Sequence, residues 1–305
     1  MMNKFPGGTW PVMLTPFTRS GVDYGALRAL TNWYIDQGVD GLFAVCQSSE
    51  MLFLSLEERI QIAQTVVQAA GHVPVIASGH VSDAVSDQVA ELSAMAKTGV
   101  QALILITNRM ADEGESDEVW RVRTQMLVDT LDPDIPLGLY ECPHPYKRLV
   151  SLANLRWAAQ SGRFFFMKDT CCDAMTLKER ILAIAGTPMR LYNANATTLL
   201  SSLRDGAAGY CGVMANFHPA LYVWLCANPD DPQADALSDF LSVASQIERQ
   251  YYPVNAKYHL GEIEGLPIGT HCRARDDAGF TEIFRREVWA LHRLAMRLAP
   301  IGDPA

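Results

Sequence analysis

A lysine ends an apolar run near the middle of the chain. The run Phe-Phe-Phe-Met directly precedes Lys168, and Asp169 follows it. An ammonium group at the end of a buried strand is costly to desolvate. Such a lysine extends its amine to solvent, pairs with a carboxylate (Glu141, Asp169 or Glu50), or acts as an amine nucleophile. The last interpretation predicts a Schiff base with a carbonyl substrate, whose iminium accepts electrons while a C–C bond breaks or forms.

Two other polar groups follow apolar runs in the same way. Tyr140 ends the run Leu-Gly-Leu-Tyr, and another run is followed by a polar turn of Gln47, Ser48, Ser49 and Glu50. A phenol next to a Schiff-base lysine moves a proton to and from the carbinolamine, whereas packing in the core is the alternative for a tyrosine. The hydroxyls and backbone N–H groups of the turn are suited to hold a carboxylate, or they satisfy the turn's own backbone.

The histidines show no metal-binding spacing. His80 and His144 lie at the ends of predicted strands, His218 opens a predicted helix, and no H-x-H or H-E-x-x-H sequence occurs. A metal site that includes Glu141 or Asp169 is the remaining alternative. We therefore predict that the site contains no metal.

These residues must be positioned by a chain in which short apolar runs alternate with amphipathic stretches. Strands are predicted at residues 9–17, 41–46, 73–78, 102–107, 136–141, 164–170, 189–193 and 207–213, and helices at 23–37, 55–70, 82–97, 116–131, 151–160, 173–185, 196–204 and 219–227. Strict alternation predicts a parallel sheet, and eight such units match a closed (β/α)8 TIM barrel. A doubly wound sheet is the alternative, but no G-x-G-x-x-G follows the first strand. The polar groups described above fall at the carboxyl ends of strands, where barrel active sites lie.

The last quarter of the chain has a different pattern. After the acidic segment 230–232, helices are predicted at 233–250, 254–260 and 281–298 with no strands between them. We therefore predict a catalytic barrel over residues 1–228 and a helical C-terminal extension over residues 229–305.

The composition excludes several classes of protein. The chain has 305 residues, of which 49% are hydrophobic, which suffices for a large core. Its net charge of -9, without a Lys/Arg-rich stripe, argues against nucleic acid or an anionic membrane as a partner. The 7 cysteines form no C-x-x-C pair, and the N-terminus lacks an apolar signal core. These features predict a reduced, soluble, cytoplasmic protein without a membrane span.

The ordered set of motifs resembles the dihydrodipicolinate synthase / N-acetylneuraminate lyase family of class I, Schiff-base pyruvate aldolases. The matching segments are 15–17, 38–42, 46–50, 54–59, 140–143, 166–170 and 205–209, with Asn216 and Pro219. The resemblance implies a barrel with C-terminal helices, a homo-oligomer (a tetramer or a dimer), a small 2-keto acid as the substrate, and no metal or organic cofactor.

The resemblance also implies roles for individual residues. Lys168 would form the Schiff base, and Tyr140 would act as the proton shuttle. Ser48 and its neighbours Gln47 and Ser49 would bind the keto-acid carboxylate. The backbone at Cys211 would line the floor of the pocket.

Three positions depart from the pattern of the synthases in this family. Gln47 stands in place of the threonine that joins two tyrosines in a proton relay. No tyrosine occurs near Thr107, where the second tyrosine belongs, and Pro145 stands in place of the arginine that anchors the partner substrate. The relay and the anchor of the synthases are therefore both absent from their expected positions.

We accordingly expect a Schiff-base lyase or aldolase that acts on pyruvate or a related 2-keto acid. The alternatives are a true 4-hydroxy-tetrahydrodipicolinate synthase with a rewired site, a non-catalytic barrel that binds a keto acid, and a metal-dependent class II aldolase. The acidic residues Asp112, Glu113 and Glu115 in a neighbouring loop argue against a strongly anionic partner substrate if they face the pocket.

Overall fold

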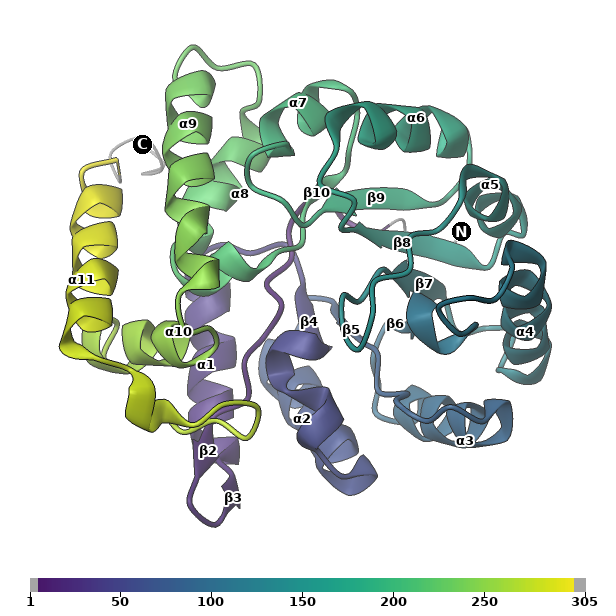
Figure 1. Cartoon of the computed structure of the whole chain (residues 1–305), viewed down its shortest axis with the longest axis horizontal. Coiled ribbons are helices and arrows are strands. Elements are labelled where there is room, and N and C mark those ends of the chain that lie inside the picture. The colour runs from purple at the N-terminus through teal and green to yellow at the C-terminus, as the bar shows by residue number, and fades with distance from the viewer. Residues whose placement is uncertain (1–4, 299–305) are drawn as a thin grey trace.

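Eight parallel strands form a barrel in the computed structural model, which describes residues 5–298 (Figure 1). In spatial order they are β1 (Gly8–Thr9), β10 (Gly209–Tyr210), β9 (Arg190–Asn193), β8 (Phe164–Asp169), β7 (Leu137–Tyr140), β6 (Ala102–Ile106), β5 (Val75–Ala77) and β4 (Leu42–Val45). A parallel bridge between Val12 and Phe43 joins the first segment to β4, so the sheet closes on itself. The predicted fold class is confirmed. Residues 1–4 and 299–305, the outer ends of the predicted barrel and extension, lie outside the described residues.

Helices follow the strands around the barrel. They are α1 (Tyr24–Asp36), α2 (Leu56–Ala70), α3 (Val85–Ala96), α4 (Asp117–Thr130), α5 (Leu152–Gln160), α6 (Ala174–Ile184), α7 (Leu199–Arg204) and α8 (Pro219–Ala227). Local caps explain where several of them begin. The Asp23 side chain accepts the Ala26 N–H at the start of α1, and Ser55 forms a capping box with Glu58 at the start of α2.

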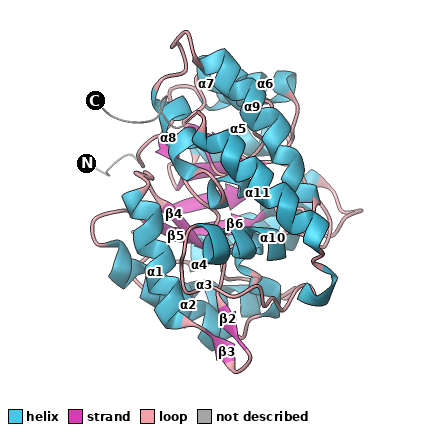
Figure 2. Ribbon diagram, turned by 90° about the vertical axis from the view of Figure 1, so that its left-hand side faces the viewer, coloured by secondary structure: helices cyan, strands magenta, loops and turns pink. Residues whose placement is uncertain are grey.

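The first and last strands are much shorter than predicted. Within the predicted strand 9–17, only Thr9 and Val12 pair with barrel strands, and β2 (Phe17–Thr18) instead forms an antiparallel hairpin with β3 (Gly21–Val22). The prediction was wrong here because the prolines at positions 11 and 16 have no N–H to donate to a ladder. The hairpin lies at one end of the molecule in both Figure 1 and Figure 2. In the predicted strand 207–213 only β10 pairs, because the chain turns into a 3₁₀ helix at Val213–Asn216.

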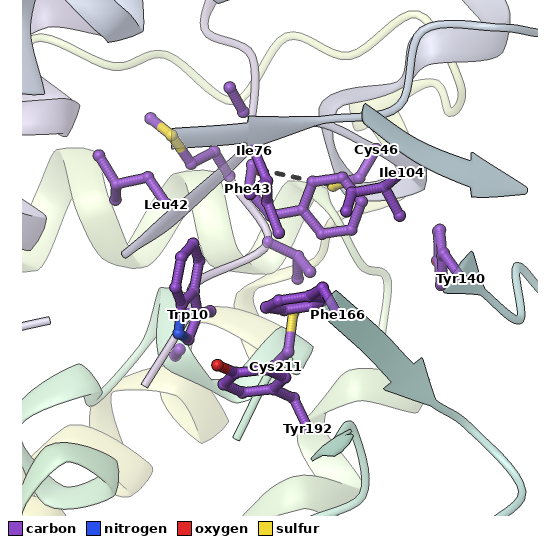
Figure 3. Packing of buried hydrophobic residues seen from close by; sticks show 14 of the residues in the cluster. Trp10, Leu42, Phe43, Cys46, Ile76, Ile104, Tyr140, Phe166, Tyr192 and Cys211 are labelled. Atoms are coloured by element: carbon purple, nitrogen blue, oxygen red, sulfur yellow. Dashed lines mark hydrogen bonds between the residues drawn. The ribbon is translucent and has the colours of Figure 1, made fainter. Parts of the chain in front are cut away.

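An aromatic layer fills the barrel interior (Figure 3). The rings of Phe166 and Tyr192 stack with their centroids 4.0 Å apart, and the Trp10 ring packs edge-on against both. All three side chains are fully buried. Phe166 precedes Lys168 by two residues and therefore shares its face of β8. The aromatic layer thus lies beneath the lysine.

A buried charge cluster joins β7 and β8 to α6. The guanidinium of Arg180 on α6 forms ion pairs with Glu141, whose Oε1 lies 2.9 Å from Nη2, and with Asp169. Glu141 follows the last residue of β7, and Asp169 is the last residue of β8. Because successive strand side chains point to opposite faces, these carboxylates lie on the helix side of the sheet, whereas Tyr140 and Lys168 face the interior.

The charges in this cluster determine one another's ionisation. Burial raises the pKa of Glu141, the nearby charge of Asp169 raises it further, and Arg180 acts in the opposite direction. Burial tends to lower the pKa of Arg180, but the two carboxylates outweigh burial and hold the pKa above its usual value. Arg180 also donates to the carbonyl of Val150 at 2.8 Å, so the cluster fixes the loop after β7 as well.

Helices without strands follow the barrel, as predicted. They are α9 (Ala234–Ala244), α10 (Val254–Tyr258) and α11 (Glu282–Met296), which lie together beside α1 and α8 in Figure 1. The predicted helix 233–250 divides at Ala244 into α9 and a 3₁₀ turn, η5 (Ser245–Arg249). Among the described residues, no helix has the length and apolar character needed to cross a membrane. The division into domains at residue 228 stays a prediction.

Replacing Arg180 by methionine tests the buried cluster. Breaking a buried ion pair on one side leaves uncompensated charge, so we expect the free energy of unfolding in urea at pH 8 to fall by about 3–5 kcal/mol. The loss should shrink as pH falls towards 5, because Glu141, whose pKa burial raises, then takes up a proton and no longer carries unpaired charge. The matched control is Arg286→Met, which removes an exposed pair with Glu282 and should change stability little. Equal losses in the two variants would contradict the role of the cluster.

Candidate functional site

The structure brings Lys168 and Tyr140 together. They are paired in register across β7 and β8. Lys168 is only 4% exposed, and its Nζ lies 4.1 Å from the centroid of the Tyr140 ring and 5.7 Å from that of Phe43. The amine of Lys168 therefore lies against aromatic rings.

No carboxylate neutralises Lys168 among residues 5–298. Of the three candidate partners, Glu141 and Asp169 pair with Arg180. Glu50 pairs with the buried Lys257, whose Nζ lies 2.7 Å from Oε1. The interpretation of Lys168 as a structural ion pair is therefore wrong for all three carboxylates. The same contacts direct Glu141 and Asp169 away from the interior, so they are not available there as metal ligands.

Tyr140 is a neutral phenol in this environment. Burial, followed by the nearby thiol of Cys142, raises the pKa of Tyr140 well above its usual value. The side chain is 3% exposed. A phenol that keeps its proton at neutral pH can donate that proton to an oxygen atom bound next to Lys168.

A cavity of about 580 Å³ opens at the carboxyl ends of the strands, around Lys168 and Tyr140. Its lining also includes Gln47, Ser48, Lys147, Thr170, Asn195, Glu248, Tyr252 and Arg275. The size suits a small organic substrate.

The residues predicted to bind a carboxylate divide into two groups. Gln47 and Ser48, in the 3₁₀ turn after β4, line the cavity. The Ser49 hydroxyl instead donates to the Cys46 carbonyl at 2.6 Å and accepts the Cys46 N–H at 2.9 Å, so it closes its own turn. Cys211 is buried and does not line the cavity. The next two residues, Gly212 and Val213, do.

The segment between α9 and α10 supplies two cavity residues that sequence reasoning missed. Glu248 forms no ion pair within the described part of the chain, and burial raises its pKa to about 7 although the charges of Lys168 and Arg249 act to lower it. Tyr252 is partly buried, and the loss of solvent around its phenol raises its pKa well above the usual value, while the nearby Ser48 acts to lower it. No motif marks either residue, because the sequence shows only a helical pattern there.

The solvent side of the cavity carries positive charge. The exposed side chains of Lys147 and Arg275 belong to its lining. The acidic loop residues do not: Asp112, Glu113 and Glu115 lie outside the lining, and Glu115 pairs with Arg123 on α4. These acidic side chains therefore do not face the cavity and do not disfavour an anionic partner substrate.

Comparisons with known proteins agree with the geometry. The model of the "Dihydrodipicolinate synthetase family" matches residues 6–275. The 4-hydroxy-tetrahydrodipicolinate synthase of Pseudomonas aeruginosa is 25% identical over 274 residues, which are 86% of this chain and 90% of that protein. The enzyme of the same name from Shewanella sp. (strain MR-7) is 27% identical over 273 residues, 84% of this chain and 88% of that protein.

Solved structures share the fold. The dihydrodipicolinate synthase from Acinetobacter baumannii complexed with pyruvate superposes with a TM-score of 0.84 at 23% identity, over 95% of this chain and 99% of that one. A prophage protein of the dihydrodipicolinic acid synthase family from E. coli K12, also in complex with pyruvate, gives a TM-score of 0.82 at 22% identity, over 96% and 98% of the two chains. The family model spans most of the length of this chain, which therefore belongs to the dihydrodipicolinate synthetase family.

Proposed function

We propose that this protein is a Schiff-base-forming lyase or aldolase that acts on pyruvate or a related 2-keto acid. The observation that carries the proposal is the amine of Lys168, which lies in a cavity against Tyr140 with no carboxylate partner among residues 5–298. Family membership supports it, as do the pyruvate complexes of two structural neighbours. The cytoplasmic location and the homo-oligomeric state stay predictions.

The proposed chemistry begins at Lys168. Its neutral amine attacks the ketone carbon of the substrate, and Tyr140 donates its proton to the carbinolamine oxygen, which leaves as water. The resulting iminium draws electrons from the bond between the α-carbon and the hydroxyl-bearing β-carbon, and the hydroxyl gives up its proton to a base, so cleavage leaves an enamine and an aldehyde. The base returns that proton to the enamine carbon. Water then attacks the iminium, and the proton that this addition releases goes back to Tyr140, so the keto acid leaves and both Lys168 and Tyr140 are regenerated. Aldol addition follows the same steps in reverse.

Gln47 and Ser48 are proposed to hold the carboxylate of the keto acid. The Gln47 Oε1 accepts the thiol of Cys142 at 3.2 Å, which leaves its NH₂ group free to donate into the cavity. The Ser48 hydroxyl lies in the same lining. Neutral donors suffice for a monocarboxylate when the positively charged iminium forms beside it.

Glu248 is proposed as the base for the bond-breaking step. Retro-aldol cleavage requires removal of a proton from the hydroxyl on the departing carbon. Glu248 lines the cavity together with Lys168, and a carboxylate whose pKa is about 7 accepts and returns a proton at neutral pH. Glu248 belongs to η5, whereas Tyr140 ends β7, so the two residues would serve different steps of the reaction.

A second candidate function is that of a 4-hydroxy-tetrahydrodipicolinate synthase. The relatives from Pseudomonas aeruginosa and Shewanella sp. carry this name. Lys147 and Arg275 on the solvent side of the cavity offer positive charge for the carboxylate of a second substrate, although Pro145 stands where the synthases keep an arginine.

Borohydride trapping tests the Schiff base. With saturating pyruvate, we expect reduction to leave a stable adduct on Lys168, located by peptide mass mapping, and none on Lys168→Ala. Lys257 is a matched internal control, because it is equally buried but paired with Glu50. Tyr140→Phe should still form the adduct, but more slowly. Unmodified protein at saturating pyruvate and other 2-keto acids would refute the imine mechanism, and stabilisation by pyruvate without an adduct would indicate a binding protein.

The pH dependence tests Glu248. Because burial raises its pKa to about 7 and the base must be ionised, kcat for retro-aldol cleavage should rise as pH increases through 7. Glu248→Gln should abolish this rise of kcat with pH and lower kcat by about 100-fold or more, while borohydride trapping on Lys168 persists. The control is Glu262→Gln, which changes an exposed glutamate of the same C-terminal region. An unchanged pH profile in Glu248→Gln would exclude its role as the base.

Turnover with pyruvate and aspartate semialdehyde tests the second candidate. If the protein is a synthase, Arg275→Ala should raise KM for the semialdehyde about tenfold or more and leave KM for pyruvate unchanged, because Arg275 lies on the solvent side of the cavity. The comparison variant is Arg286→Ala, on the exposed surface of α11. Adduct formation with pyruvate but no turnover with the semialdehyde would exclude the synthase and leave the lyase proposal intact.

A further inference from the structure

A second cluster of reactive side chains lies outside the cavity. His259 begins a π-helical turn, η6 (His259–Ile263), and Glu264 ends it. His292 comes from α11, and His218 immediately precedes α8. The cluster therefore joins the barrel to the C-terminal helices that lie beside α8 and α1 in Figure 1. None of these residues takes part in the chemistry proposed above.

The ligand atoms of this cluster converge. One nitrogen each from His259 and His292 and one oxygen of Glu264 all lie within 4.8 Å of one another. Glu264 Oε1 is 3.1 Å from His259 Nε2 and 3.8 Å from His292 Nδ1. The His218 ring is adjacent, with its centroid 5.3 Å from that of His259 and 6.4 Å from that of His292.

These imidazoles are not satisfied by the protein. His218 Nε2, both ring nitrogens of His259 and His292 Nδ1 are buried and have no hydrogen-bond partner among the described residues. The 3.1 Å approach of Glu264 to His259 is close enough for an ion pair, but it does not have the alignment of a hydrogen bond. By contrast, the buried His80 uses both nitrogens: Nδ1 lies 3.0 Å from Gln88 Oε1, and Nε2 accepts the Ile106 N–H at 2.7 Å.

We propose that His259, Glu264 and His292 bind a divalent transition-metal ion, best matched by Zn²⁺, with His218 or a water as the fourth ligand. Imidazole nitrogens with one carboxylate oxygen are a ligand set of zinc and its neighbours, whereas Ca²⁺ and Mg²⁺ take oxygen ligands. Trp33 Nε1 donates to Glu264 Oε2 at 3.3 Å, which orients Oε1 towards the histidines. The side chains of His292 and Glu264 are 20% and 23% exposed, so an ion can enter.

The π-helical turn explains how His259 and Glu264 meet. The Glu264 N–H donates to the His259 carbonyl at 3.1 Å, a five-residue step that places both side chains on one side of the turn. Such turns occur often at functional sites. Because the same ion also holds His292 of α11, the bound metal would stabilise the C-terminal helices against the barrel.

Metal binding to the full chain tests the proposal. After treatment with EDTA and its removal, we expect titration with Zn²⁺ to load about one equivalent and to raise the unfolding midpoint, because an ion that binds only the folded state stabilises it. Co²⁺ should give the visible absorption of a site with imidazole ligands. His292→Ala, which changes a partly exposed side chain, and Glu264→Gln should each weaken Zn²⁺ binding at least tenfold.

The control is His72→Ala, which removes an exposed histidine outside the cluster and should bind Zn²⁺ like the unmodified chain. Failure of the stripped protein to bind micromolar Zn²⁺ would overturn the proposal. So would binding that is equally strong in His292→Ala and Glu264→Gln. Circular dichroism of each variant establishes that it is folded, and borohydride trapping on Lys168 reports the first site independently.

Discussion

The ion pairs of Arg180 are the interaction on which the candidate site depends. Two carboxylates, Glu141 and Asp169, directly follow the two residues that face the cavity, Tyr140 and Lys168. A carboxylate paired directly with the lysine would favour its ammonium form, which cannot attack a carbonyl. By binding both carboxylates behind the sheet, Arg180 removes them from the interior and anchors the loop after β7 at the same time.

The other acidic group near the cavity is neutralised in a similar way, but by a different part of the chain. Glu50 lines the cavity and binds the buried Lys257 of α10, and its second oxygen accepts the backbone N–H groups of residues 273 and 274. The C-terminal helices are therefore part of the electrostatics of the site. Glu248 is the exception, because it has no cation of its own among residues 5–298 and its pKa is raised to about 7.

The sequence predicts the barrel and the centre of the site, but not the walls of the cavity. The alternation of strands and capped helices predicts the fold. Lys168 and Tyr140 are identified as candidates because each ends an apolar run. Ser49 could not be distinguished from Ser48 by residue type, since only the turn geometry directs its hydroxyl to the backbone. Glu248 and Tyr252 reach the cavity through the packing of helices that are distant in sequence, which no local pattern encodes. For the same reason the histidine cluster, spread over residues 218–292, escapes a search for short metal-binding motifs.

The aromatic layer beneath Lys168 has a consequence for the order of events at the site. With Trp10, Phe166 and Tyr192 filling the barrel below the lysine, small molecules reach it only from the side of the strand ends. In the proposed mechanism, a keto acid joined to Lys168 at the bottom of the cavity cannot leave before the molecule that lies above it. The proposal therefore implies an ordered kinetic sequence, in which the keto acid binds first and leaves last.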